Sequence, residues 1–369
     1  MFYLGIDQHS KQLTVNLRNE EGSTVIGRQV STEWTRVREF LSQVRERCAA
    51  DGGYIAIVEV CGFNDWLLEL LPEYGCRDVV LIQADERSRK KTDRRDASRL
   101  SELLWINRGR LLARQPVQGL RRVFIPSAAD QENRQLTALR KRLTDSRTKQ
   151  INRLKHVLHK HNLLRDCPTK GFRTKAARAW LKGLSVGELD RFEVEQLLEQ
   201  WELVDRELAQ VEVRIRQRAQ RNDNAMIIAT LYGGTPGYAA LALAASIGPI
   251  DRFPRPRSLA NYWGLTPTCR NSGEATQRLG SISKQGSRIA RFLLGQLSTQ
   301  LLRRDRWMRD WYKRIKHRRG ARIARVAVMR RMATIIWQML KYKQPYLPGE
   351  PTRRKAVLSP SAPSSKSAA

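Results

Sequence analysis

The chain has 369 residues, of which 41% are hydrophobic, which is enough for two or three folded domains. Lys and Arg number 68 against 36 Asp and Glu, so the formal net charge is +32 at pH 7. A positive field of this size predicts a polyanionic partner, above all nucleic acid, because each phosphate that a protein neutralises releases condensed counterions. An anionic membrane surface is the competing partner. The sequence has no apolar run of about 18 residues and no signal peptide, so we expect a soluble, intracellular protein with no membrane partner.

Five cysteines and five histidines show no pattern of a zinc site or of a disulfide framework. The cysteines stand far apart in the sequence, without a C-x-x-C pair, at Cys48, Cys61, Cys76, Cys167 and Cys269. We therefore expect neither structural zinc nor disulfide bonds.

The first 85 residues differ from the rest in charge, since they hold 8 Lys and Arg against 13 Asp and Glu. Their apolar patterns predict strands and amphipathic helices. In chain order these are strands at 2–8, 12–19 and 25–31, a helix at 34–48, a strand at 54–60, a short helix around 66–71, a strand at 78–84 and a helix from about 92. A three-stranded meander followed by helix, strand, helix, strand and helix is the element order of the ribonuclease H and Holliday-junction-resolvase fold.

The last of these helices begins with two acids inside a basic run, KKTDRRDASRL at residues 90–100. Asp93 and Asp96 are three residues apart and so share one face of the helix. One interpretation is that they complement the helix dipole and pair with neighbouring arginines at the surface. The other is that they form half of a divalent-metal site, since Mg²⁺ takes oxygen ligands. The second interpretation requires further acids elsewhere in the chain.

Two of the predicted strands supply such acids. Asp7 lies in the first strand, and Glu59 lies among apolar neighbours in the central strand, where an ionised carboxylate is costly unless a cation or hydrogen bonds compensate it. In the expected fold these strands are neighbours, and the helix with Asp93 and Asp96 packs near their ends. The sequence therefore predicts four converging carboxylates that hold two Mg²⁺ ions about 4 Å apart for a phosphodiester displacement.

Two long helices are expected in the middle of the chain. The first covers about 128–163, with a leucine stripe that Arg147 interrupts. The second carries apolar residues at coiled-coil spacing, namely Leu197, Trp201, Val204, Leu208, Val211 and Ile215. Pro168 and Gly171 allow the chain to reverse between them. An antiparallel hairpin, a dimer stalk and the cover of a globular core are all compatible with this pattern.

A third, helical unit begins near residue 226, and its last helices, at about 300–342, are dense in arginine with interleaved tryptophans. The tail is rich in Pro, Ser, Ala and Lys, which predicts disorder. The fold class expected is thus an α/β domain followed by all-α parts. The expected boundaries are 1–125 for the resolvase-like catalytic domain, 126–225 for the coiled-coil domain, 226–345 for the C-terminal domain and 346–369 for the tail.

Ser272 stands in a polar, glycine-containing loop within TPTCRNSGEATQRLG. One interpretation is a turn serine. The other is a nucleophile, which needs a base, or nearby cations or metal, to activate its hydroxyl. Arg270, Arg278 and Lys284 are close in sequence, but sequence alone leaves both interpretations open.

At this point the chain resembles the DEDD transposases of bacterial insertion sequences, a family described as bridge-RNA-guided recombinases. The matching segments are GIDQHSK, VEVCG, KTDRRDA, TPGYAALALAASIGPIDRF, LANYWGLTPTCRNSG and GSISKQGSRIARFLL, and they extend over nearly the whole chain up to about residue 345. Family members commonly have Ser-Ser-Gly where this chain has Asn271, Ser272 and Gly273, so the serine itself is kept.

The resemblance implies a site and a reaction. Asp7, Glu59, Asp93 and Asp96 are similar to the metal-binding acids of the family, and Ser272 is similar to its nucleophile. The implied reaction forms a covalent phosphoserine and exchanges strands between donor and target DNA. The implied cofactors are Mg²⁺ and a structured guide RNA, the bridge RNA. The implied assembly is a homo-tetramer built from dimers, and the implied location is the bacterial cytoplasm at the nucleoid, with a helical C-terminal transposase domain carrying the serine.

Two other classes of protein are compatible with part of these features. A Mg²⁺-dependent Holliday-junction-resolvase-like nuclease would use the four acids with water as the nucleophile, and Ser272 would then be structural. A packaging protein for RNA or DNA would need none of the acids. A strand glutamate among apolar neighbours disfavours the packaging protein, because burial of that carboxylate would then have no purpose.

Overall fold

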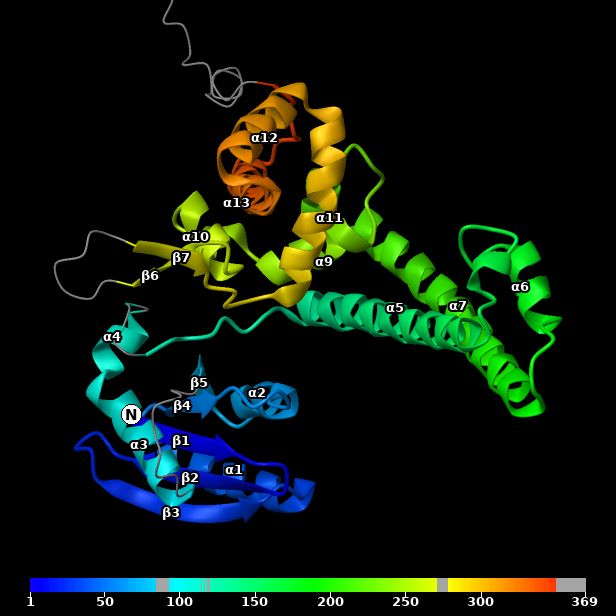
Figure 1. Ribbon diagram of the computed structural model, residues 1–369. Coiled ribbons are helices and arrows are strands. Elements are labelled where there is room, and N and C mark those ends of the chain that lie inside the picture. Colours follow the sequence, from blue (N-terminus) through cyan, green and yellow to red (C-terminus); the bar gives the residue numbers. More distant parts are fainter. Residues whose placement is uncertain (84–92, 114, 116, 118–119, 271–277, 350–369) are drawn as a thin grey trace, which may run out of the picture. The chain divides into compact units, whose positions relative to one another are not determined.

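The computed structural model describes residues 1–83, 93–113, 115, 117, 120–270 and 278–349. The chain divides into two compact units, Met1–Ile125 and Pro126–Ala369, which are considered separately (Figure 1). None of the described helices is both long enough and apolar enough to cross a membrane.

The first unit is an α/β unit built on a five-stranded sheet in the order β3-β2-β1-β4-β5. β1, β2 and β3 are antiparallel neighbours, whereas β4 and β5 run parallel to β1. The element order from β1 to α3 is the one expected from the sequence, and the short helix α4 was not expected. The elements are β1 (Phe2–Gln8), β2 (Gln12–Arg18), β3 (Thr24–Ser31), α1 (Trp34–Cys48), β4 (Tyr54–Glu59), α2 (Asp65–Glu73), β5 (Cys76–Ile82), α3 (Asp93–Ile106) and α4 (Arg108–Leu112).

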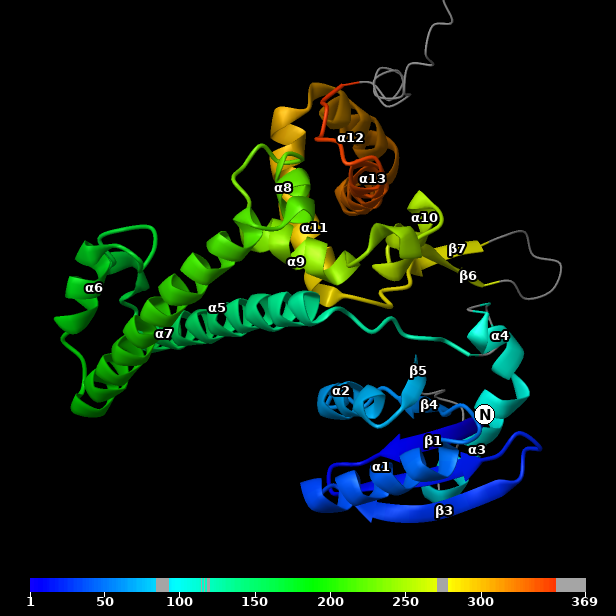
Figure 2. The same ribbon diagram turned by 180° about the vertical axis from the view of Figure 1, so that it is seen from behind.

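Helices cover both faces of this sheet, because its central strands are apolar on both sides. Leu4, Ile6 and Val58 pack with α1 and α2 on one face. Tyr3 and Ile57, one residue out of phase, pack with α3 and α4 on the other. Figures 1 and 2 show α1 and α3 on opposite sides of the sheet. Because successive side chains of β1 and β4 point to opposite faces, the position of each polar residue in its strand decides on which face of the sheet it lies.

The close packing of α3 on β1 depends on Gly5. A Cβ at this position would lie 2.5 Å from the Ser101 amide nitrogen, and nearer still to the Ala97 carbonyl oxygen. Hydrogen bonds from β2 add to this contact, since Arg18 Nε donates to Ser101 Oγ over 3.0 Å and the Ser101 hydroxyl donates to Asn16 Oδ1 over 2.6 Å. The helix is therefore held at a fixed depth and register on the sheet.

The second unit begins with two helices of 33 residues each, α5 (Ala128–Lys160) and α7 (Glu188–Gln220), which pack against each other. As the residue number rises along α5 it falls along α7 in every ion pair that joins them, so the helices are antiparallel. The N···O distances are 2.7 Å for Glu132–Arg218, 3.0 Å for Arg140–Glu212, 3.3 Å for Arg147–Asp205 and 2.8 Å for Lys160–Asp190. Of the arrangements compatible with the sequence, the chain forms the helical hairpin.

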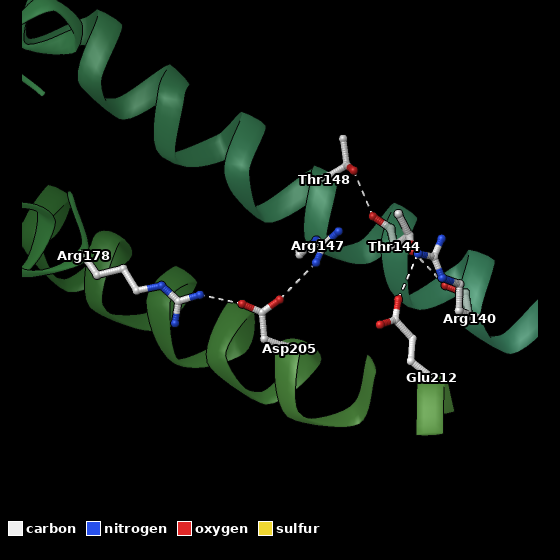
Figure 3. Close-up of polar contacts among 7 residues, drawn as sticks. All are labelled: Arg140, Thr144, Arg147, Thr148, Arg178, Asp205 and Glu212. Atoms are coloured by element: carbon white, nitrogen blue, oxygen red, sulfur yellow. Dashed lines mark hydrogen bonds and ion pairs between the residues drawn. The ribbon is translucent and has the colours of Figure 1, made fainter. Parts of the chain in front are cut away.

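Arg147, which interrupts the leucine stripe of α5, has a partner that explains its position. Asp205 accepts from Arg147 Nη1 at 3.3 Å and from Arg178 Nη2 at 2.5 Å (Figure 3). Arg178 belongs to α6 (Lys175–Lys182) and also lies over the ring of Trp201, 4.6 Å from its centroid. One carboxylate therefore ties α5, α6 and α7 together.

The apolar stripe of α7 is buried within a single chain. Trp201 is fully buried, Leu208 is 4% exposed and Ile215 is 1% exposed. A dimer stalk, one of the arrangements that the sequence allowed, is therefore not needed to cover this stripe, because a heptad pattern looks the same whether the partner helix belongs to the same chain or to another.

In the residues that the structure describes, the regular elements of the rest of the second unit are helices and one small β-hairpin. Val211, Ile215 and Ala219, in the C-terminal part of α7, pack in one core with the helices that follow. The opposite end of the hairpin, where α5 ends and α7 begins, packs with α6 in a separate core. The remaining elements are η1 (Leu164–Asp166), α8 (Asp223–Ala229), α9 (Tyr238–Ile247), η2 (Ile250–Arg252), α10 (Pro256–Tyr262), β6 (Pro267–Arg270), β7 (Arg278–Ile282), α11 (Arg288–Arg304), α12 (Arg306–Arg319) and α13 (Ala321–Lys341).

Candidate active site

Two of the predicted acids leave the sheet at the same edge and on the same face. The parallel register of β1 and β4 pairs Gly5 with Ile57, so Asp7 and Glu59 each lie two residues further along adjacent strands. Residues two apart on a strand point the same way, and Gly5 faces α3. Asp7 and Glu59 therefore project from the α3 face at the carboxyl ends of the two strands, and both are partly buried.

The N-terminal turn of α3 lies toward the same edge. Ala97 and Ser101 contact Gly5, whereas Trp105, further along α3, donates its Nε1 to Glu20 O beyond the other end of the sheet, over 2.9 Å. The helix thus runs opposite to β1 and begins near the strand ends. Asp96, in its first turn, is half-buried. The backbone of Asp93 begins the helix, while its side chain falls outside what the structure describes.

A buried polar network holds this edge of the sheet. Asn64 Nδ2 donates to Gln8 Oε1 at 2.9 Å and to the Glu59 carbonyl oxygen at 3.0 Å, and Asn64 Oδ1 accepts from the Cys61 amide at 2.8 Å. Gln8 and Asn64 are each 4% exposed. Because buried polar groups that are fully paired rigidify their surroundings, this network fixes the residues adjacent to Asp7 and Glu59.

Two further residues meet Asp7 that sequence reasoning did not identify. His9 Nε2 lies 3.1 Å from Asp7 Oδ2. Thr14, opposite Asp7 on β2, is 1% exposed, and its hydroxyl has no hydrogen-bond partner within the described part of the chain. A buried hydroxyl without a partner is a position where a bound water or ion completes the bonding. The only local signal for these roles was the polar run DQH at the end of an apolar strand.

The donor set at this edge fits a hard divalent cation, because carboxylate and hydroxyl oxygens on rigid elements are its usual ligands. Among the described side chains, no group of three or more His, Cys, Asp or Glu is gathered closely enough to hold a metal ion. The backbone places the elements that carry Asp7, Glu59, Asp93 and Asp96 at one edge. The complete ligand set remains a prediction, since it includes the side chain of Asp93.

The predicted nucleophile, Ser272, lies outside the described residues, and the structure describes only the hairpin on either side of it. That hairpin is anchored at its base, where Gly264 (φ +67°) and Gly286 (φ +104°) bring the turn after α10 into backbone contact with residues 284–286. A Cβ on Gly264 would meet the Gln285 carbonyl oxygen, and one on Gly286 would meet that of Tyr262. Both glycines are therefore required by close approach as well as by φ.

Two cysteine thiols can be set aside as competing nucleophiles. Burial raises the pKa of the Cys48 thiol to about 11 and that of Cys76 to about 12. Both thiols stay protonated at neutral pH, and the thiolate is the reactive form.

Comparison with known proteins identifies the class to which this fold and site belong. Residues 4–162 match a transposase family model of the DEDD type, and residues 227–313 match the model "Transposase IS116/IS110/IS902 family". Together the two matches take in the strand-end acids, the start of α3 and the β6–β7 hairpin. The class is therefore a DNA transposase.

Individual relatives agree with this class. The transposase for insertion sequence element IS1111A of Coxiella burnetii is 29% identical over 268 residues, which cover 69% of this chain and 68% of the relative. A probable family 20 transposase of Pseudomonas aeruginosa is 24% identical over 368 residues, which cover 94% of this chain and 98% of the relative. The chain is thus similar to IS110-type insertion-sequence transposases in both of the segments that the family models match.

Proposed function

We propose that this transposase cuts and rejoins DNA through a covalent bond between Ser272 and a DNA phosphate, with Asp7, Glu59, Asp93 and Asp96 as its Mg²⁺-binding acids. The observation that supports the acidic half is the convergence of the ends of β1 and β4 with the start of α3, fixed by the packing of Gly5 against Ala97 and Ser101. The serine half rests on the similarity to the transposase family and on the polar, glycine-containing sequence around residue 272.

The proposed exchange conserves the energy of the phosphodiester. The Ser272 oxygen forms a bond to phosphorus while the bond from phosphorus to one sugar oxygen breaks. The serine hydroxyl gives up its proton, and the departing sugar oxygen takes one up. Attack of a sugar hydroxyl from the second DNA on the phosphoserine reverses these steps and joins the strands, so no external energy source is needed.

The chain's own groups have separate tasks in this proposal. A bound divalent cation would supply electrostatic stabilisation of the oxygens at the reacting phosphate. Asp7 and Glu59 would hold it from rigid strands, while His9, 3.1 Å from Asp7 Oδ2, orients the Asp7 carboxylate. The buried Thr14 hydroxyl supplies a donor or acceptor to the same oxygen-rich edge, and the Gln8–Asn64 network keeps the strand ends from moving apart.

The larger arrangement is also a proposal. The strand order β3-β2-β1-β4-β5 supports a ribonuclease H and resolvase-like domain over 1–125. The helical hairpin supports a coiled-coil domain over 126–225, and the second core supports a transposase domain over 226–345 that precedes the tail at 346–369. We propose a homo-tetramer built from dimers that acts on donor and target DNA at the nucleoid, with a structured bridge RNA as guide, because a net charge of +32 suits the simultaneous binding of several polyanions.

Trapping of the protein–DNA adduct tests the function. Protein, Mg²⁺, guide RNA and end-labelled target DNA are mixed and denatured, and the linked peptide is mapped. We expect a strand that stays attached after denaturation and maps to Ser272, and we expect Ser272→Ala to lose the adduct, cleavage and joining together. Ser185→Ala, at a described and exposed serine between α6 and α7, serves as the control and should keep all three.

The alternative function is a resolvase-like nuclease in which water attacks the phosphate. The orphaned Thr14 hydroxyl beside Asp7 favours an ordered water or ion there and is compatible with this alternative. Cleavage that persists in Ser272→Ala, with free ends and no adduct in the natural protein, would replace the phosphoserine mechanism with hydrolysis.

A further inference from the structure

A groove of about 960 Å³ lies in the second unit, between the β6–β7 hairpin and one face of α13. On α13 the lining residues recur every three or four positions from Arg322 to Gln338, as expected for one helical face. At about 1.5 Å per residue, this face is about 24 Å long. The groove is thus an elongated channel along a helix and much longer than a pocket for one small molecule.

Most of the side chains that line the groove are of two kinds, apolar and basic. Its walls are largely apolar, with Ile282 from the hairpin, Trp311 from α12 and Ile323 and Val326 from α13. Four arginines also line it, namely Arg319, Arg322, Arg330 and Arg331, and its lining residues, all within the described ranges, include no Asp or Glu. Such a lining is complementary to a ligand that is anionic along its length and apolar in between.

A pair of tryptophans positions one of these arginines. The Arg331 guanidinium lies 4.5 Å from the ring centroid of Trp307 and 4.8 Å from that of Trp311. Cation–π contacts of this kind restrict the rings as well as the arginine. Trp311 is therefore an oriented aromatic surface beside fixed positive charge, which is the combination that binds bases of a single strand by stacking.

A single strand fits these features better than a duplex does. The bases of a duplex are stacked on one another and present only their edges in the grooves, so the apolar residues of the protein groove would have no apolar partner. An unpaired strand exposes its base faces together with its phosphates. The apolar walls of the groove can then contact the bases, and the arginines can pair with the phosphates.

We propose that the groove between the β6–β7 hairpin and α13 binds an unpaired segment of nucleic acid, roughly four nucleotides or longer. Its bases lie against Trp311, Ile323 and Val326, and its phosphates lie at Arg319, Arg322 and Arg330. The inference rests on the proposed function and deepens it, since strand exchange requires locally unpaired DNA. The hairpin that forms one wall also carries Ser272 in the sequence between its strands.

Binding of a short oligothymidylate tests the groove without any need for catalysis. The ligand is a labelled strand of about ten nucleotides, and a hairpin duplex of similar length is the comparison. Ile323 is 53% exposed, so Ile323→Glu introduces a carboxylate into the groove at little cost to the fold. Met226→Glu, at a 46% exposed position of α8 outside the groove, is the matched control.

We expect Ile323→Glu to weaken oligothymidylate binding about tenfold, as for the loss of one stacked base, and Met226→Glu to change it less than about twofold. Duplex binding should fall less than about twofold in both variants, because it depends on phosphate contacts spread over the surface. Photo-cross-linking with a 5-iodouracil strand should place the linked peptide at Trp311 or on α13.

Several results would overturn this inference. Equal losses for strand and duplex would reduce the groove to a general phosphate site, and cross-links confined to other regions would place the strand elsewhere. If Ile323→Glu lowers the mass measured by light scattering and leaves oligothymidylate binding unchanged, the groove is occupied by a second copy of the chain. Retention of cleavage by Ser272→Ala would remove the phosphoserine mechanism, yet it would leave the binding result as it stands, so the two failures can be told apart.

Discussion

The two compact units of this transposase differ in charge far more than in size of core. Residues 1–125 contain 20 Lys and Arg against 17 Asp and Glu, whereas residues 126–369 contain 48 against 19. Nearly all of the positive excess therefore belongs to the helical unit. A carboxylate site in a strongly positive unit would be neutralised by its own neighbours, so the near-neutral unit is the better location for acids that bind metal.

The units also differ in how their polar residues are held. Around Asp7 and Glu59, buried hydrogen bonds of Gln8, Asn64 and Cys61 fix the backbone of the strand ends. On α12, most of the basic side chains are exposed to solvent. The difference teaches that reaction at a phosphate requires side chains held in defined positions. Binding to a phosphate backbone, in contrast, can be shared among many exposed Lys and Arg side chains.

The largest effect should come from removal of one strand-end carboxylate. Glu59→Gln keeps the shape of the side chain and removes its charge, so we expect DNA cleavage to fall about a thousandfold, the upper range for loss of one stabilising group in an active site. Nucleic-acid binding should stay within about twofold, because the basic residues that bind the backbone are in the other unit. Cleavage and filter-binding assays on the same preparation measure both.

Glu39→Gln is the control for this experiment, since Glu39 lies on α1, pairs with Arg36 at 3.2 Å and is 51% exposed. The Glu39→Gln variant should cleave DNA at the rate of the natural protein. If Glu59→Gln cleaves as fast as Glu39→Gln in Mg²⁺, the four-acid site is wrong and the division of tasks between the units loses its main support.

The next largest effect concerns salt. A protein that contacts four phosphates loses about a hundredfold in affinity for duplex DNA between roughly 50 and 200 mM salt. We expect a fragment of residues 126–369 to show such a slope, because it has its own core and most of the positive charge. The fragment 1–125 should bind weakly with a shallow slope. A flat response in 126–369, measured by fluorescence anisotropy, would contradict the assignment of backbone binding to the helical unit.

Local patterns were sufficient to predict the element order from β1 to α3 and the positions of Asp7 and Glu59 in their strands, but not α4 or the β6–β7 hairpin. Asp7 and Glu59 were recognised because a carboxylate in an apolar, period-two run stands out, and the element order then made their strands neighbours. The strand after α2 was expected at 78–84 and is found at Cys76–Ile82, a shift of two residues at an end where the pattern carries little information.

Contacts between distant segments were not predictable in this way. Thr14 meets Asp7 through strand pairing, and Asn64 reaches Gln8 from a loop more than fifty residues away, so neither has a local signature. The stripe on α7 specified a helix with an apolar face but not its partner. The prediction for Ser272 is untested by the structure, because residues 271–277 lie outside the described ranges.

A third experiment sharpens the idea that the acidic edge depends on the depth of α3. Gly5→Ala forces a methyl group against the backbone of Ala97 and Ser101, so the helix must move away from β1. We expect a loss of about 2–3 kcal/mol in the free energy of unfolding, as for overpacking of a core. We also expect a loss of cleavage beyond what the remaining folded protein explains, because the first turn of α3 shifts with the helix. Denaturant titration and a cleavage assay below the transition measure the two effects.

Gly27→Ala is a suitable comparison, since a Cβ at Gly27 on β3 would have its nearest neighbour, Asn16 Nδ2, at 3.6 Å, an ordinary contact. It should change stability by less than about 1 kcal/mol, the range of β-propensity in a strand. Equal stability and activity of the two alanine variants would show that α3 tolerates a change in depth, and the geometric argument for the acidic site would fail.

The smallest effect should be found in the basic unit, where charges brace the hairpin and are not part of the proposed chemistry. Asp205→Asn leaves the half-buried Arg147 and Arg178 without their shared carboxylate (Figure 3), and both side chains are about a quarter exposed or less. We expect a loss of about 1.5 kcal/mol, typical of a hydrogen bond to a charged group with partial solvent compensation. Asp145→Asn, whose carboxylate is 53% exposed and pairs with Lys141 within one helix at 2.6 Å, should cost less than about 0.5 kcal/mol. Thermal unfolding of the two variants decides the matter: if they unfold together, the Arg147–Asp205–Arg178 cluster contributes no more than a surface ion pair, and the register of the hairpin is set by its apolar stripe alone.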